Sequence, residues 1–379
     1  MDPLTQRHAA GHDAAGVARP VVAERMALLR LVLTPGVGPA RLRDGIRQAG
    51  SAGDLLDCAG LLRGLGIQPS MIADEAQAAQ VLADCARLDV RCLGWHEDDY
   101  PSTLLELEQA PATLFVRGDA RVVRGPAIAI VGSRKATVYG RRIAQRWAQE
   151  LSEAGVVVVS GLALGIDGAA HTGALAGSTP TVGVVAGAIE RPSPRAHAYL
   201  YRQMLQQGGA VFCEYPPGTQ VQGFQFPVRN RLMAGLSMGV LVVEAGPRSG
   251  ALHTVDWAQK LGRPVLVVPG PIDRDSSRGT NDLLRQGAEP ALEVRDVLDA
   301  IGFGSLAWTG VGAQSGAGLP WAVESDEAQV WQALSEPGEL GALASLTGLP
   351  VPRVLAALTR LEIDRRVRRD ADQGYRRSQ

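Results

Sequence analysis

Three loops of this sequence combine glycine with serine or arginine directly after a short apolar run, a combination suited to phosphate binding. Glycine lets the backbone approach a ligand closely, and the planar guanidinium of arginine grips a phosphate through two hydrogen bonds. A helix that begins near Thr137, after the first loop, would add N–H groups that attract an anion. The loop residues that we expect to bind phosphate are Gly132, Ser133, Arg134, Ser160, Gly161, Gly165, Ser249 and Gly250.

These loops do not match the cradles of common nucleotide cofactors. They contain neither the GxGxxG fingerprint of dinucleotide binding nor the GxxxxGK loop of ATPases and GTPases. No acidic residue ends the second apolar run, where it would hold a ribose. We therefore expect no NAD or ATP site and no cofactor.

A fourth segment, residues 222–231, places aromatic rings among arginines: Phe224 and Phe226 precede Arg229 and Arg231. Rings stack on unpaired bases while guanidinium groups neutralise phosphates, which is what binding of single-stranded DNA requires. The competing interpretation is that Phe226 belongs to the core and that the arginines are solvated. The pattern alone leaves both open.

A nucleotide-processing enzyme is the alternative function, because related Rossmann-like folds hydrolyse N-glycosidic bonds. Such an enzyme needs a carboxylate beside the sugar, and Glu244, Asp167 and His171 are the candidates. We expect instead that Asp167 and His171 brace a helix start and that Glu244 bonds loop amides. The hydrolase loop P-G-G-x-G-T-x-x-E is also absent, with V-E-A-G-P-R-S-G in its place. We predict no catalytic residue and no enzyme activity.

Short apolar runs predict the elements that hold these loops. Runs buried on both faces are typical of parallel strands, and most of the runs are separated by helical stretches. We predict an α/β fold with a Rossmann-like, doubly wound, mainly parallel sheet, whose carboxyl edge gathers the loops. The expected strands are Ala127–Val131, Val156–Val159, Thr181–Val185, Ala210–Cys213, Gly239–Val243 and Pro264–Val268.

Two smaller domains are expected to flank this core. A helix from near Glu24, the turn at 34–39 and a second helix resemble a small helix-hairpin-helix or SAM-like domain, although a plain helix hairpin fits as well. Three helices and a hairpin at the other end are typical of a winged helix, suited to DNA or to a protein partner. The expected boundaries are a disordered tail at 1–22, the helical domain with an extended connector at 23–110, the core at 111–301, a flexible linker at 302–324 and the winged-helix-like domain at 325–379.

Composition narrows the class of protein. The chain has 379 residues, 46% of them hydrophobic, and a net charge of −1, so any DNA-binding charge must be local. Its four cysteines show no CxxC pair and no zinc-like cluster with histidine, so no metal site is expected. No signal peptide and no apolar stretch of about 20 residues is present, which predicts a cytoplasmic protein.

Six motifs in order resemble the DNA-processing protein A family, also called DprA or Smf. The resemblance implies binding of single-stranded DNA, a homodimer, and loading of RecA recombinase in natural transformation and DNA repair, with no membrane partner. It also implies that Arg229, Asn230 and Arg231 hold phosphates, in addition to the loop residues, and that Phe226 stacks on a base. The motifs are G-S-R-x-x-T-x-Y-G at 132–140, S-G-x-A-x-G-I-D-x-x-A-H at 160–171, E-Y-P-P-G at 214–218, F-P-x-R-N-R-x-x-A-G-L-S at 226–237, V-V-E-A at 242–245 and V-P-G at 268–270.

The resemblance further implies self-association near residues 281–292, where Leu283, Leu284 and Leu292 would supply apolar contacts. Two departures from the family pattern concern DNA contacts. The G-x-G-x-D-x-x-Y-P loop common after the third strand is replaced by G-A-I-E-R-P-S-P at 187–194. No lysine precedes Phe226.

Overall fold

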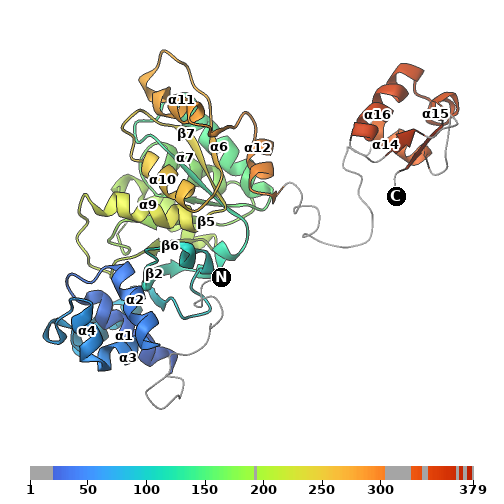
Figure 1. Cartoon of the computed structure of the whole chain (residues 1–379). Coiled ribbons are helices and arrows are strands. Elements are labelled where there is room, and N and C mark those ends of the chain that lie inside the picture. Colours follow the sequence, from blue (N-terminus) through green and yellow to red (C-terminus); the bar gives the residue numbers. More distant parts are fainter. Residues whose placement is uncertain are drawn as a thin grey trace. The chain divides into compact units, whose positions relative to one another are not determined.

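The computed structural model describes residues 20–191, 194–303, 326–334, 340–363, 367–369 and 374–377 (Figure 1). Contacts divide the chain into two compact units, Met1–Thr309 and Gly310–Gln379, and each is described by itself. The predicted tail at 1–22 ends too late, because a helix already begins at Val21. Of the predicted linker, only Gly302 and Phe303 lie within the described residues.

Nine strands of the described chain form one sheet in the order β1-β2-β6-β5-β4-β3-β7-β8-β9. Strands β3 to β9 run parallel, while β1 and β2 are antiparallel at one edge. The six predicted strands are confirmed, and β1, β2 and β9 were not predicted. The strands are β1 (Arg91–Gly94), β2 (Thr113–Gly118), β3 (Ala127–Gly132), β4 (Val157–Ser160), β5 (Thr181–Val185), β6 (Ala210–Cys213), β7 (Gly239–Glu244), β8 (Val265–Val267) and β9 (Glu289–Pro290).

The strand order reverses between β3 and β7. From β3 the chain adds β4, β5 and β6 on one side, then crosses to add β7, β8 and β9 on the other. In a doubly wound sheet this switch point leaves a crevice at the carboxyl ends of the strands, because the helices on either side of it turn to opposite faces. The predicted Rossmann-like fold is therefore confirmed.

Helices cover both faces of the sheet because successive side chains of each strand point to opposite faces. In β3, Ala127, Ala129 and Val131 face one side, and Ile128 and Ile130 face the other. The first face packs against α9 (Gln225–Gly235), α10 (Leu252–Lys260) and α11 (Arg278–Arg285), and α9 and α10 cross the sheet in Figure 1. The second face packs against α6 (Val138–Glu153), α7 (Ile166–Ala174), α8 (Ala198–Gln206) and α12 (Val294–Ala300).

The N-terminal helical domain has a small core of its own, while Leu29, Ala78 and Cys85 pack against the sheet. Glu24 of α1 is buried, and its carboxylate accepts hydrogen bonds from the amides of Ala52 and Gly53 (2.6 and 3.2 Å), which caps the start of α3. The turn between α1 and α2 passes through Gly36 at φ 79°, a conformation that glycine adopts without strain. The helices are α1 (Val21–Leu33), α2 (Pro39–Ala49), α3 (Ala52–Asp57), α4 (Ala59–Gly64) and α5 (Glu75–Arg87).

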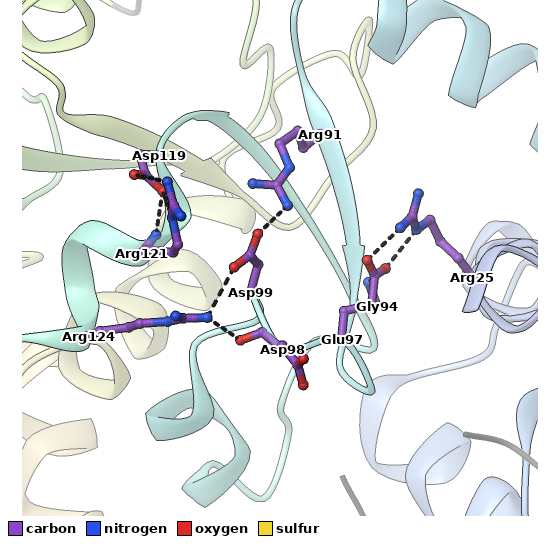
Figure 2. Close-up of polar contacts among 9 residues, drawn as sticks. All are labelled: Arg25, Arg91, Gly94, Glu97, Asp98, Asp99, Asp119, Arg121 and Arg124. Carbon is purple, nitrogen blue, oxygen red and sulfur yellow. Dashed lines mark hydrogen bonds and ion pairs between the residues drawn. The ribbon is translucent and has the colours of Figure 1, made fainter. Parts of the chain in front are cut away.

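The extended connector predicted at the end of the segment 23–110 is instead part of the sheet. Its strands β1 and β2 pair with each other, and β2 pairs with β6, so the predicted boundary at 110/111 splits a hairpin. Figure 2 shows what fixes the turn after β1: Arg25 of α1 donates two hydrogen bonds to Glu97 (2.7 and 2.5 Å). In the same view Asp99 accepts from Arg91 (2.6 Å) and Arg124 (3.1 Å). The helical domain and the core are thus joined by an ion pair as well as by the chain.

The described residues of the second unit form three helices and a two-stranded hairpin, as predicted for a winged helix. Val330, Leu343 and Leu358 belong to its buried core, and Arg353 pairs with Asp326 (2.5 Å). No single helix among the described residues is long and apolar enough to cross a membrane; α15 and α16 together pass that test but are bent by 109°. The elements are α14 (Asp326–Ala333), α15 (Leu340–Thr347), α16 (Val351–Ile363), β10 (Val367–Arg369) and β11 (Tyr375–Arg377).

Candidate nucleic-acid interface

A cavity of about 1020 Å³ opens at the switch point between β3 and β7. The loops after β3, β4, β7 and β8 line it, together with one face of α9. Among the lining residues of α9, Phe226, Arg229, Asn230 and Met233 have a spacing of three and four residues, which places them on one stripe of the helix. Of the predicted site, the cavity lining includes Gly132, Ser133, Arg134, Phe226, Arg229, Asn230, Ser249 and Gly250.

The loop after β3 depends on a glycine where two strands approach closely. A Cβ atom on Gly132 would lie 2.7 Å from the backbone oxygen of Glu244 and 2.6 Å from a side-chain carbon of Ile166. The amide of Ser133 donates a hydrogen bond of 2.7 Å to the same Glu244 oxygen. Gly132 therefore sets the shape of the loop that carries Arg134 into the cavity wall.

The side chain of Glu244, the last residue of β7, lies at the start of α6. Its buried carboxylate accepts a hydrogen bond from the Thr137 hydroxyl (2.6 Å) and one from the Thr137 amide (3.1 Å). The prediction that this carboxylate bonds loop amides is confirmed. The prediction that the start of α6 offers free N–H groups to an anion is wrong at this amide, because an internal carboxylate already holds it. The Thr137 amide is therefore not available to a phosphate.

Arg134 and Phe226 form the wall nearest the start of α9. The Arg134 guanidinium lies 5.0 Å from the centre of the Phe226 ring, within the range of a cation–π contact. Phe226 is half-buried, so it is neither a core ring nor a free one, while Phe224 is 60% exposed. The freely accessible ring of this segment is Phe224.

Three polar residues lie at the floor of the cavity, each more than nine-tenths buried: Asp167, Arg229 and Asn230. Arg229 donates a hydrogen bond to the backbone oxygen of Val184. Burial lowers the pKa of Arg229 to about 10, so the guanidinium stays charged at neutral pH. Burial raises the pKa of Asp167, and the charge of Arg229 opposes that rise. The floor thus holds a guanidinium and a carboxyl group close enough to influence each other.

Three predicted phosphate contacts, Ser160, Gly161 and Gly165, support the loops rather than line the cavity. The buried Ser160 hydroxyl donates to the backbone oxygen of Ile130 (2.6 Å). Gly161 lies beneath the guanidinium of Arg229, and a Cβ atom on Gly165, at φ 81°, would collide with the Ser133 oxygen. These three residues are therefore not among those that line the cavity, and the Ser160 hydroxyl is already used within the fold.

The predicted phosphate contact at Arg231 is wrong. Its side chain is 1% exposed and forms a paired ion contact with Glu214, with nitrogen–oxygen distances of 2.5 and 2.8 Å. Its Nε also donates to the backbone oxygen of Gln109 (3.1 Å). Arg231 joins α9 to two other segments of the chain and has no face left for a phosphate.

Three cationic residues of the cavity were not predicted: Lys135, Arg248 and Arg278. Each follows a strand of the sheet, after β3, β7 and β8 respectively, so the rule that ligands meet the carboxyl edge could have found them. With Arg134 and Arg229, five cationic side chains line the cavity, against the carboxyl groups of only two residues, Asp167 and Asp275.

The candidate catalytic residue His171 is inaccessible. Its ring is fully buried, with Nδ1 2.8 Å from the Thr181 hydroxyl, and burial lowers its pKa to about 3. His171 does not brace a helix start as predicted, because it lies in the last turn of α7 and contacts the Thr181 hydroxyl of β5. Asp167, in the first turn of α7, accepts a hydrogen bond from the Ala163 amide (3.3 Å), which confirms the predicted bracing role for this residue.

The predicted dimer contacts are only partly on the surface. Leu283 is 7% exposed and belongs to the core against the sheet, so its assignment to a subunit interface is wrong. Leu284 is half-buried against the same core, and Leu292 is 72% exposed. Within the described residues, no three side chains of His, Cys, Asp or Glu are grouped to hold a metal ion.

Two family models match this chain. DNA recombination-mediator protein A matches residues 91–302, and the DprA winged helix domain matches residues 314–373. Neither model describes an enzyme family. The putative DNA processing protein DprA of Mycobacterium tuberculosis is 36% identical over 92% of this chain and 88% of its own length. Protein Smf of Escherichia coli is 37% identical over 70% of this chain and 71% of its own.

Two solved structures are similar to this one. DprA from Streptococcus pneumoniae aligns with a TM-score of 0.60 at 30% identity, covering 73% of this chain and 96% of that one. DprA from Helicobacter pylori aligns with a TM-score of 0.50 at 29% identity, covering 55% and 94%. The Helicobacter pylori structure is described as that of a protein with a unique single-stranded DNA binding mode.

Proposed function

This chain belongs to the DNA recombination-mediator protein A family, and from that premise we propose that it binds single-stranded DNA in the cavity between β3 and β7. The phosphates lie along the cationic rim formed by Arg134, Lys135, Arg248 and Arg278. Phe224 and Phe226 stack on the bases, whose faces are exposed only in a single strand.

The observation that supports this proposal most directly is the convergence of cations from three separate loops at one edge of the sheet. Lys135 and Arg134 come from the loop after β3, Arg248 from the loop after β7 and Arg278 from the segment after β8. A single small anion needs fewer cations. A backbone of repeated phosphates matches such a row, and the related Helicobacter pylori protein is described as a single-strand binder.

The test is fluorescence anisotropy with matched single-stranded and duplex oligonucleotides at several salt concentrations. We expect the single strand to bind more tightly, with a log–log salt slope of about −0.7 for each phosphate neutralised. Equal affinity for the two forms, or a flat salt response, contradicts the proposal.

We also propose that the protein acts on RecA recombinase, in natural transformation and DNA repair, as the family resemblance implies. Assembly of RecA on DNA coated with single-strand-binding protein, followed through RecA ATPase activity, tests this role. Acceleration by this protein is the expected result, and the same assembly rate with and without it contradicts the proposal.

A cytoplasmic homodimer is proposed on the same basis. The 72% exposed Leu292 is the described leucine of segment 281–292 that remains available for a subunit contact. Light scattering on Leu292→Glu and the parent protein tests it: a dimer that becomes a monomer is expected, and an unchanged mass removes Leu292 from the interface.

A further inference from the structure

Two buried polar atoms of residues that line the cavity have no hydrogen-bond partner. They are the hydroxyl oxygen of Thr254, a fully buried residue, and Nε of Arg229, which is 5% exposed. Both residues line the cavity. Buried polar atoms of native proteins are nearly always paired, with protein, water or ligand. These two therefore indicate an occupant with polar groups of its own.

The floor also carries hydrogen-bond acceptors, which cannot bond to a phosphate because a phosphate itself offers only acceptors. Asp167 brings a carboxyl group that is 6% exposed. The amide nitrogen of Asn230 donates to the Gly250 oxygen (2.9 Å), so its carbonyl oxygen is the end available to a ligand. A phosphate offers only acceptors and negative charge, and the carboxylate repels it. An occupant with donors beside acceptors fits this floor better.

A nucleobase edge carries both donors and acceptors. The order of these groups on guanine matches a carboxylate beside a guanidinium best. Its Watson–Crick edge presents the acceptor O6 followed by two N–H donors, at N1 and N2. A carboxylate accepts both donors, and an adjacent guanidinium donates to O6. Adenine, cytosine and thymine each place an acceptor opposite one carboxylate oxygen.

We propose that Asp167 and Arg229 read the Watson–Crick edge of one unpaired guanine, which enters the cavity while its phosphates stay on the cationic rim. The hydroxyl of Thr254 supplies a further hydrogen bond to the base. This inference rests on the proposed binding of single-stranded DNA and adds a base preference to it.

The test compares the affinity of the full-length protein for an all-thymidine strand and for the same strand with one central guanosine. We expect roughly ten-fold tighter binding of the strand with guanosine. Replacing guanosine by inosine, which lacks the N2 amino group, should lower the affinity most of the way back to that of the all-thymidine strand. Equal affinity for the three strands overturns the inference, while failure to bind any of them overturns the proposed function instead.

Two variants test whether the preference for guanosine depends on the residues of the cavity floor. Asp167→Asn keeps one acceptor for the Ala163 amide but offers a donor to the base, and it should abolish the preference, measured as the ratio of the affinities for the two strands. The ratio is the readout because loss of a negative charge from the cavity should raise the affinity for both strands alike. Thr254→Val, nearly equal in shape, should reduce the preference by roughly three-fold.

Asp273→Asn is the matched control, because it makes the same charge change at an exposed residue that does not line the cavity. It should retain the full preference. A preference that survives in both Asp167→Asn and Thr254→Val overturns the assignment, and thermal melting identifies a variant that fails to fold. Should Asp167→Asn fail to fold, Thr254→Val alone decides the outcome.

Discussion

The guanidinium of Arg134 lies 5.0 Å from the centre of the Phe226 ring, and this contact joins the loop after β3 to the first turn of α9. The ring holds the charged group at the wall of the cavity, and the guanidinium covers part of the ring. The two side chains therefore act as one unit in binding, although their chemistry differs.

Loss of either partner should weaken DNA binding non-additively. Arg134→Ala removes a charge and should make the salt slope shallower by somewhat less than one, whereas Phe226→Ala should barely change it. A double-mutant cycle in oligonucleotide affinity should yield a coupling of about 0.5–2 kcal/mol, the range of cation–π contacts. Strictly additive losses would mean that the two side chains bind DNA independently.

Phe224→Ala should weaken binding without weakening the fold. Its ring is 60% exposed, so the free energy of unfolding should change by less than about 0.5 kcal/mol, while the loss of one stacked base should cost about 1–3 kcal/mol of binding. Chemical unfolding and anisotropy measure the two quantities. Tyr199→Ala is the control, since Tyr199 is similarly exposed (65%) but lies on α8, outside the segment 222–231 that carries the proposed stacking rings. If both variants bind alike, Phe224 does not stack.

Arg231→Met should destabilise the protein without removing a DNA contact. The substitution leaves Glu214 as a largely buried carboxylate without its partner, and we expect a loss of about 3–5 kcal/mol in the free energy of unfolding. Adding Glu214→Gln should recover part of that loss, because the unpaired charge is then gone. DNA affinity of the folded single variant should equal that of the parent; a selective loss of binding would return Arg231 to the site.

Stability should fall as the solution becomes acidic, because His171 stays neutral in the folded protein. Its pKa is lowered from 6.5 to about 3 by burial, so between these values the unfolded chain binds a proton that the folded chain does not. The contribution is constant above pH 6.5 and should decline by about 2 kcal/mol on going to pH 5.

Urea unfolding of the parent and of His171→Gln, at a pH well above 6.5 and at pH 5, measures this effect. The variant should lose this component of the decline, whereas His253→Gln, which alters an exposed histidine, should keep it. An equal decline in all three proteins would assign the pH dependence to other groups.

Removal of the C-terminal module should leave DNA binding by the core largely intact. All residues that line the cavity lie upstream of residue 279, within the first compact unit. A fragment of residues 1–324 should match the affinity of the full chain within about three-fold, or roughly 0.6 kcal/mol. Loss of binding by a fragment with unchanged circular dichroism would place part of the DNA site in the winged helix.

Much of the core could be predicted from the sequence, because strands buried on both faces appear as continuous apolar runs. The runs at 127–131 and 239–243 became β3 and β7, and the loops that follow them met at one edge, as parallel strands require. The strands β1 and β9 were missed because they lie at the two edges of the sheet, where such continuous apolar runs are not required. Strand β2 was missed although it pairs on both sides and its residues 113–116 are buried.

Helix geometry explains why Arg229 and Arg231 have different environments. Residues two apart on an α-helix point in nearly opposite directions, so only one of these arginines could face the cavity. Which one does so was decided by Glu214 and Gln109, which are distant in sequence and pair with Arg231. The occupation of the start of α6 by Glu244, and the unpaired atoms of Arg229 and Thr254, likewise depend on segments that only the folded chain brings together. A sequence pattern specifies which groups a segment carries, but hydrogen bonding and burial depend on distances across the fold.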